Sequence, residues 1–167
     1  MTKIIILLIA IFIINLLEKS LNNFNIYKEK QFNRDFLEHG FISVEDLKEL
    51  DEYEFYDWIT ELVNKMGYKF IREYANKNKS EIKFIYEKNS SLGLIKMIYS
   101  SSGKIGVESL QQEVGFMASK NLIQGVFITS SVFDEEAKEY IKSISDKFNI
   151  SLIDGNSICN KKRQLWY

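Results

Sequence analysis

Apolar residues recur at steps of three and four positions along three segments of the chain, as they do on one face of a helix. The first segment ends at Gly67, and glycine favours the left-handed conformation that often follows a helix. The third begins with Asp134, Glu135 and Glu136, and acidic side chains stabilise the first turn of a helix. These segments predict three helices, whose apolar positions are Phe55, Trp58, Ile59, Leu62, Val63 and Met66; Val107, Leu110, Val114, Phe116 and Met117; and Ala137, Tyr140, Ile141 and Ile144.

Shorter stretches between and after these helices have the patterns of β-strands. Residues 81–86 alternate between apolar and more polar side chains, which indicates a half-buried strand. Residues 92–99 are more continuously apolar, so we expect them near the middle of a sheet. Further strands are predicted to start at Tyr68 and to cover residues 125–129 and 150–153.

The predicted elements follow one another as helix, three strands, helix, strand, helix and strand. A shorter helix is expected after Ser43 and another after Asn156. Three strands in a meander, followed by two helix–strand units, predict a mixed sheet with helices on both faces. The expected fold class is therefore α/β.

The amino-terminus carries the longest apolar run. Ile4 to Leu17 is a run of fourteen residues that is apolar except for Asn15. As a helix it would be about 21 Å long, somewhat less than the ~30 Å hydrocarbon core of a bilayer. A signal peptide has an apolar region of this length, but no small-residue cleavage site follows this one. We therefore predict an uncleaved transmembrane anchor over residues 1–19, with lysines that can reach the membrane surface.

Basic residues are distributed unequally around this run. Lys3 precedes it, and four basic side chains follow it closely: Lys19, Lys28, Lys30 and Arg34. The positive-inside rule then predicts a single-pass protein of the cell membrane with its carboxy-terminal domain in the cytoplasm. The single cysteine, Cys159, cannot form an internal disulfide, which agrees with a reducing compartment.

Length and composition fit one folded domain behind the anchor. The chain has 167 residues, of which 46% are hydrophobic and 27% charged, and this excludes a disordered polypeptide. Residues 20–42 are polar without a clear period and predict a juxtamembrane linker, so the domain covers residues 43–167. The formal net charge is −1, so no overall field attracts the protein to nucleic acid.

Several short sequences occur in an order and at a spacing that matter together. They are Phe55-Tyr56 through Met66-Gly67-Tyr68, Ile105-Gly106-Val107 with Gly115, Ile128-Thr129 with Phe133 and Ala137, and Leu152-Ile153-Asp154-Gly155. Over about residues 44–158 this pattern resembles the catalytic domain of the Mrr-type restriction endonucleases, within the PD-(D/E)XK nuclease superfamily. The resemblance implies a restriction-endonuclease-like mixed sheet flanked by helices, and bacterial members with an amino-terminal membrane segment are a familiar variety.

The resemblance also implies a set of site positions. Members of this family carry an aspartate on the second strand and a Glu/Gln-x-Lys on the third, and the carboxylates hold the Mg²⁺ that activates water. In this chain Lys83 occupies the aspartate's position, Ile95 and Met97 occupy the Glu/Gln and lysine positions, and Tyr56 replaces a helix glutamate. We therefore predict a degenerate pocket with neither metal nor other cofactor.

Two residues remain as catalytic candidates, Glu81 and Lys96. A shift of one residue would make Lys96 the family's lysine, but Leu94 would then take the position of the acid. Glu81 is the nearby carboxylate that could substitute for the missing one. If Lys96 is instead structural, a buried lysine needs an acidic partner, and the candidates are Glu81 and Glu108.

We expect a membrane-anchored domain of restriction-endonuclease fold that has lost nuclease activity and binds DNA or a protein partner, a second copy included. One alternative is an active Mg²⁺-dependent DNA endonuclease that uses Glu81 and Lys96 in an altered geometry. Another is an interaction scaffold at the membrane, with its cleft filled by Leu94, Ile95 and Met97. An active nuclease needs two acids near one metal, a DNA-binding protein needs a basic rim, and a scaffold needs an apolar patch.

Overall fold

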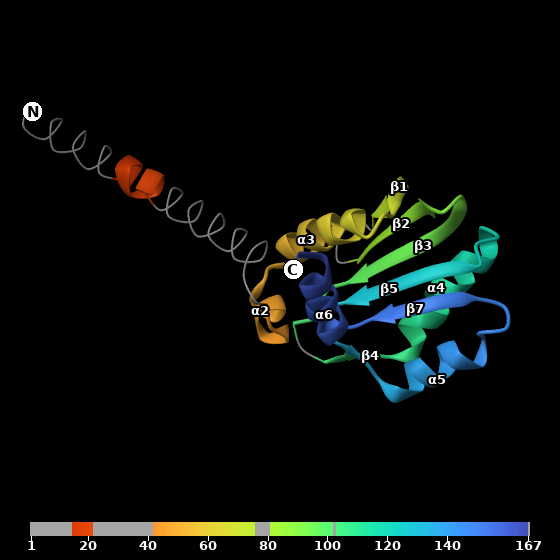
Figure 1. Cartoon of the computed structure of the whole chain (residues 1–167). Helices are drawn as coiled ribbons and strands as arrows, with labels where there is room; N and C mark the ends of the chain where they lie inside the picture. Colours follow the sequence, from red (N-terminus) through yellow and green to blue (C-terminus); the bar gives the residue numbers. More distant parts are fainter. Residues whose placement is uncertain (1–14, 22–41, 76–80, 102, 167) are drawn as a thin grey trace, which may run out of the picture. The chain divides into compact units, whose positions relative to one another are not determined.

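The computed structural model describes residues 15–21, 42–75, 81–101 and 103–166 (Figure 1). Contacts divide the chain into two units, residues 1–41 and 42–167. In the first unit residues 15–21 form a helix, while residues 4–14 of the predicted anchor and most of the predicted linker lie outside the described residues. No helix in the described ranges has both the length and the apolar character needed to cross a bilayer.

The second unit is built on a five-stranded mixed sheet (Figure 1). Strands β1, β2 and β3 are antiparallel neighbours, and β3, β5 and β7 are parallel neighbours. This arrangement confirms the predicted meander followed by two crossover connections. Across the sheet the strands are β1 (Lys69–Ala75), β2 (Glu81–Lys88), β3 (Ser91–Ile98), β5 (Gln124–Thr129) and β7 (Asn149–Ile153).

Helices cover both faces of this sheet, as the α/β pattern predicts. In Figure 1, α6 lies in front of the sheet and α4 lies behind it, and apolar side chains of α5 belong to the same buried cluster as those of α4. Asp51 and Glu54 form a reciprocal capping box at the start of α3, with hydrogen bonds of 2.8 and 3.0 Å. The helices are α2 (Val44–Glu49), α3 (Glu52–Lys65), α4 (Val107–Ser119), α5 (Glu135–Ser143) and α6 (Gly155–Trp166), and a small second sheet pairs β4 (Lys104–Ile105) with β6 (Val132–Phe133).

A tight turn joins β2 to β3. Asn89 and Ser90 have φ angles of 51° and 61°, and Lys88 pairs directly with Ser91 on either side of them. Two successive residues with positive φ form the kind of turn that matches the twist of a hairpin. The turn therefore leaves no spare residue between the two strands.

The register set by this turn separates two groups of side chains. Lys83 lies opposite Lys96, and the adjacent Ile82 lies opposite Met97. Directly opposed residues point to the same face of a sheet, and neighbours along a strand point to opposite faces. Lys83 and Lys96 therefore share one face, and Ile82 and Met97 share the other.

The face beneath α4 and α5 carries a large hydrophobic cluster of the core. Leu94 and Ile98 of β3 and Phe127 of β5 are buried there against apolar side chains of the two helices. Lys96 lies between Leu94 and Ile98 on the same strand face, and it is also fully buried. A charged side chain therefore stands in the middle of this core.

Candidate functional site

The α3 face of the β2–β3 hairpin brings together three of the positions singled out in the sequence. Tyr56 of α3 lines a cavity together with Ile82 and Phe84 of β2. Ile95 and Met97 lie on the same face, because they pair with Phe84 and Ile82 across the hairpin. Tyr56, Ile95 and Met97 thus belong to one region of the structure.

Lys83 does not belong to this region. It follows Ile82 on β2 and therefore points away from α3, toward α4. The aspartate position inferred from the sequence and the positions Ile95 and Met97 thus lie on opposite faces of the sheet. The β2 residue that shares a face with Met97, and lies directly opposite it, is Ile82.

The β3 part of the α3 face of the hairpin is apolar and buried. Ile95 and Met97 are both 0% exposed. The hydroxyl of Tyr56 donates to Glu52 Oε1 at 3.3 Å and accepts the backbone N–H of Tyr99 at 3.4 Å. Tyr56 therefore connects α3 to the end of β3, at the position where the resemblance places a glutamate.

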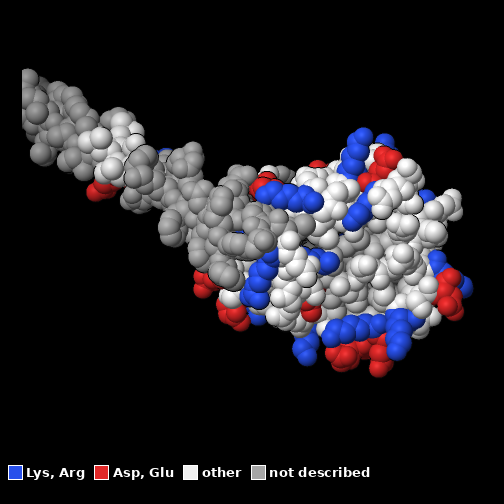
Figure 2. All heavy atoms as spheres, viewed as in Figure 1, with Lys and Arg blue, Asp and Glu red and all other residues white. Residues whose placement is uncertain are grey.

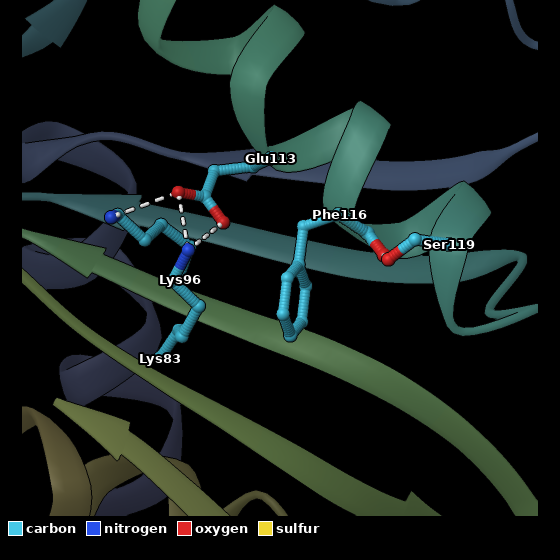
Figure 3. A network of polar contacts seen from close by, with 5 residues as sticks. All are labelled: Lys83, Lys96, Glu113, Phe116 and Ser119. Atoms are coloured by element: carbon cyan, nitrogen blue, oxygen red, sulfur yellow. Dashed lines mark hydrogen bonds and ion pairs between the residues drawn. The ribbon is translucent and has the colours of Figure 1, made fainter.

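Three charged side chains meet on the opposite face, between β2, β3 and α4 (Figure 3). Glu113 of α4 accepts hydrogen bonds from Lys83 Nζ at 2.8 and 2.9 Å and from Lys96 Nζ at 3.0 Å. The side chains of Lys96 and Glu113 are 0% and 4% exposed, and that of Lys83 is 23% exposed. Lys83 Nζ also lies 4.7 Å from the centre of the Phe116 ring. Two cations thus share one carboxylate, and only Lys83 of the three side chains reaches toward solvent.

Glu113 is the functional-site residue that sequence reasoning missed. The expected partners of Lys96 were Glu81 and Glu108, but Glu108 is exposed on the first turn of α4. Glu81 pairs through its backbone with Ile98, and its side chain lies outside the described part of the structure. The sequence signal for Glu113 is its position on the apolar face of a predicted helix. A glutamate is stable in such a buried position only when a cation pairs with it.

A cavity of about 620 Å³ lies beside Tyr56 on the α3 face. Its walls combine Tyr53, Tyr56, Thr60, Ile82 and Phe84 with four carboxylates: Asp51, Glu52, Asp57 and Glu73. Within the described residues, no group of three or more His, Cys, Asp or Glu side chains is arranged to hold a metal ion. The described part of the lining includes four acidic side chains and no lysine or arginine, so that part of the wall is negative.

The Mrr catalytic-domain model, described as restriction endonuclease, matches residues 47–161. This chain belongs to the Mrr-type restriction endonuclease family. Among solved structures, the DNA modification-dependent restriction endonuclease AspBHI matches with a TM-score of 0.51 and 10% identity over 79% of this chain and 35% of that one. The MspJI restriction endonuclease in complex with a 27-mer oligonucleotide matches with a TM-score of 0.39 and 13% identity over 65% of this chain and 26% of that one. No curated protein sequence matches the chain.

The likeness to AspBHI concerns the fold alone, and this chain spans about a third of that protein's length. The match to the Mrr catalytic-domain model includes the whole β2–β3 hairpin. In the direct register, the face of Ile95 and Met97 presents Ile82 and Phe84 from β2. In the register shifted by one residue, Lys83 and Leu94 hold the two acid positions and Lys96 holds the lysine position. Only the second register includes a residue type of the family pattern, Lys96.

Proposed function

We propose that this Mrr-type domain does not hydrolyse DNA and acts by binding. The proposal is carried by the β2–β3 hairpin, because Ile82, Ile95 and Met97 on one face offer no oxygen ligand for Mg²⁺. On the other face, Lys83 and Lys96 neutralise the carboxylate of Glu113 and occupy the space beside it. These residues therefore do not fit a magnesium ion.

The electrostatics of the 620 Å³ cavity bear on what the domain binds. A DNA backbone entering there would meet Asp51, Glu52, Asp57 and Glu73, and like charges repel. AspBHI is described as an enzyme that depends on DNA modification, which makes DNA the first ligand to test. Because of the four acids, we propose that any DNA contact uses a surface other than this cavity.

The test combines metal binding and DNA cleavage with the full-length chain in mild detergent. Calorimetry with Mg²⁺ and Mn²⁺ is expected to give no saturable binding, and supercoiled plasmid is expected to remain uncut with either metal. A Glu81→Ala variant is the matched control, because Glu81 is the acid of the active-nuclease alternative. Plasmid cleavage that disappears in Glu81→Ala and in Lys96→Met would overturn the proposal and establish an active endonuclease.

We further propose that residues 1–19 anchor the domain in the cell membrane with residues 43–167 in the cytoplasm. The apolar run from Ile4 to Leu17 and the excess of basic residues after it support this arrangement. The full chain should sediment with membranes and resist extraction by alkaline carbonate, whereas a chain starting at residue 20 should not. A protease added to intact cells should leave residues 43–167 uncut, and digestion there would reverse the proposed orientation.

A further inference from the structure

A second hollow, of about 210 Å³, lies on the α3 side of the sheet, far along the strands from α6. It is formed by the β2–β3 turn and the starts of β5 and β7, at the right-hand end of the sheet in Figure 1. In Figure 2 the face of the sheet turned to the viewer is largely uncharged, with charged side chains gathered at its edges. The walls of the hollow include the side chains of Tyr68, Tyr86, Lys88, Gln124, Asn149 and Ser151, and the described lining includes no acidic residue.

Tyr86 forms the floor of this hollow, which we call the tyrosine groove. A Cβ atom on Gly93 would lie 2.5 Å from Cζ and from the hydroxyl of Tyr86, so the ring rests directly on the glycine backbone. Tyr86 is only 3% exposed, yet its hydroxyl has no hydrogen-bond partner among the described residues. Every fully buried side-chain nitrogen or oxygen in that part of the chain has a partner, so this hydroxyl must open into the groove.

Tyr68 and Lys88 form one wall of the tyrosine groove. The rings of Tyr68 and Tyr86 are 4.8 Å apart at 79°, an edge-to-face contact. Lys88 Nζ lies 3.9 Å from the centre of the Tyr68 ring, and it has no ion pair with any described residue. An ammonium group held against an aromatic ring, without a carboxylate beside it, remains available to an anion.

The opposite wall supplies groups that both donate and accept hydrogen bonds. Gln124 at the start of β5 and Asn149 and Ser151 of β7 face the groove, and their side chains form no hydrogen bond within the described structure. Carboxamides pair well with the edges of nucleobases, because each presents a donor and an acceptor side by side. A volume of 210 Å³ is below the range of about 300–1,000 Å³ that is usual for complete small ligands. The groove is therefore suited to one planar group and its charged substituent.

We propose that the tyrosine groove binds a single nucleotide unit, with its phosphate at Lys88 and its base edge at Tyr86, Gln124 and Asn149. A nucleotide presents both groups that these side chains recognise, because its phosphate pairs with a cation and its base edge pairs with side chains that donate and accept hydrogen bonds. The nucleotide can be a free monophosphate or an unpaired unit of a nucleic-acid strand. The proposal does not depend on whether the chain cleaves DNA.

The experiment is a titration of the full-length chain in mild detergent with the four deoxynucleoside monophosphates, the matching nucleosides, inorganic phosphate and a short single-stranded oligonucleotide. Binding is followed by calorimetry and by NMR shifts of the side-chain amides of Gln124 and Asn149. Lys88→Gln should weaken binding roughly tenfold, since a hydrogen bond to a charged group contributes about that much. Tyr86→Phe removes the hydroxyl without filling the groove and should weaken binding several-fold. Lys120→Gln is the matched control, because Lys120 is an exposed lysine near an aromatic ring on another part of the domain.

Monophosphate binding that is lost in Lys88→Gln and retained in Lys120→Gln would support a site for free nucleotides. Binding of the oligonucleotide alone, with the same dependence on Lys88 and Tyr86, would support an unpaired strand as the source. Equal affinity for nucleosides and monophosphates would overturn the role of Lys88. Absence of saturable binding, or binding indifferent to both groove variants while their unfolding temperatures match the parent, would overturn the proposal.

Discussion

Lys96 Nζ lies 3.0 Å from Glu113 Oε1 in the core between β3 and α4. The two side chains are almost completely buried, so water contributes little to the stability of either charge. Such a pair adds little net stability compared with apolar side chains, but it becomes costly when one partner is removed. Lys83 joins the same carboxylate at 2.8 Å, which extends the pair toward the surface.

Replacing Glu113 by leucine should therefore destabilise the domain strongly. The change removes the Glu113 carboxylate from the buried Lys96 ammonium, and the expected loss in the free energy of unfolding is about 3–5 kcal/mol. Urea denaturation of the full chain measures this loss. Gln112→Leu is the matched control on an exposed position of the same helix, where a change within about 0.5 kcal/mol is expected. Equal stability of the two variants would mean that Glu113 is not the principal partner of Lys96.

Replacing all three charges should restore what the single change removes. The variant Lys83→Met, Lys96→Leu and Glu113→Leu removes the desolvation cost of these three charges, and the new side chains extend the surrounding core. We expect a free energy of unfolding equal to that of the parent or higher by about 1–4 kcal/mol. The urea midpoints of the triple variant, Glu113→Leu and the parent measure this difference. A triple variant no more stable than Glu113→Leu would show that packing, and not the buried charge, lowers the free energy of unfolding.

Gly93 is required by the position of the Tyr86 ring. In Gly93→Ala the new methyl group would lie 2.5 Å from ring atoms, so the ring must move and the free energy of unfolding should fall by about 1–3 kcal/mol. Gly115→Ala is the matched control, because a Cβ there meets nothing within 4 Å and alanine favours a helix by about 0.5–1 kcal/mol over glycine. Thermal unfolding should therefore shift in opposite directions for the two variants, and a similar downward shift in both would count against the ring contact.

Stability at alkaline pH should depend on Tyr86. Burial, with a smaller contribution from Tyr68, raises the pKa of Tyr86 to about 12 from its usual 10.0. The folded state then binds the phenolic proton more tightly than the unfolded state, so stability is complete below pH 10 and falls as pH rises toward 12. Tyr86→Phe should flatten this part of the stability profile, measured by urea denaturation at several pH values. A profile of the same slope in both proteins would show that other groups govern the alkaline limit.

Much of the fold could be predicted because its strands and helices have clear periods. The apolar spacing before Gly67 predicted α3, and the alternation from Glu81 to Tyr86 predicted β2. The β4–β6 pair escaped prediction because two residues in each strand are too few to show a period. The last helix was expected to be short, yet α6 covers 12 residues. Its length was underestimated because the sequence from Asn160 to Gln164 is polar and shows no apolar period.

The candidate site was harder to predict because it depends on the register of one hairpin. A slip of one residue moves every side chain of a strand to the other face, and no periodic pattern reveals which residue lies opposite Lys83. Sequence reasoning therefore grouped Lys83 with Ile95 and Met97, although they lie on opposite faces. The contact between Lys96 and Glu113 joins residues 17 positions apart, and only the crossover from β3 to α4 brings them together.

The two-residue turn at Asn89 and Ser90 helps to set which side chains of β3 face α3 and which face α4 during the evolution of this domain. A longer loop can absorb an inserted residue, but if the insertion instead shifts the pairing of β3 by one position, the odd- and even-numbered side chains of β3 exchange faces. Lys96 would then face α3 and the acid-lined cavity, while Ile95 and Met97 would enter the core beneath α4. A single in-frame insertion that shifts the pairing would change the face to which every β3 side chain points. Separate substitutions along the strand would otherwise be needed for the same result.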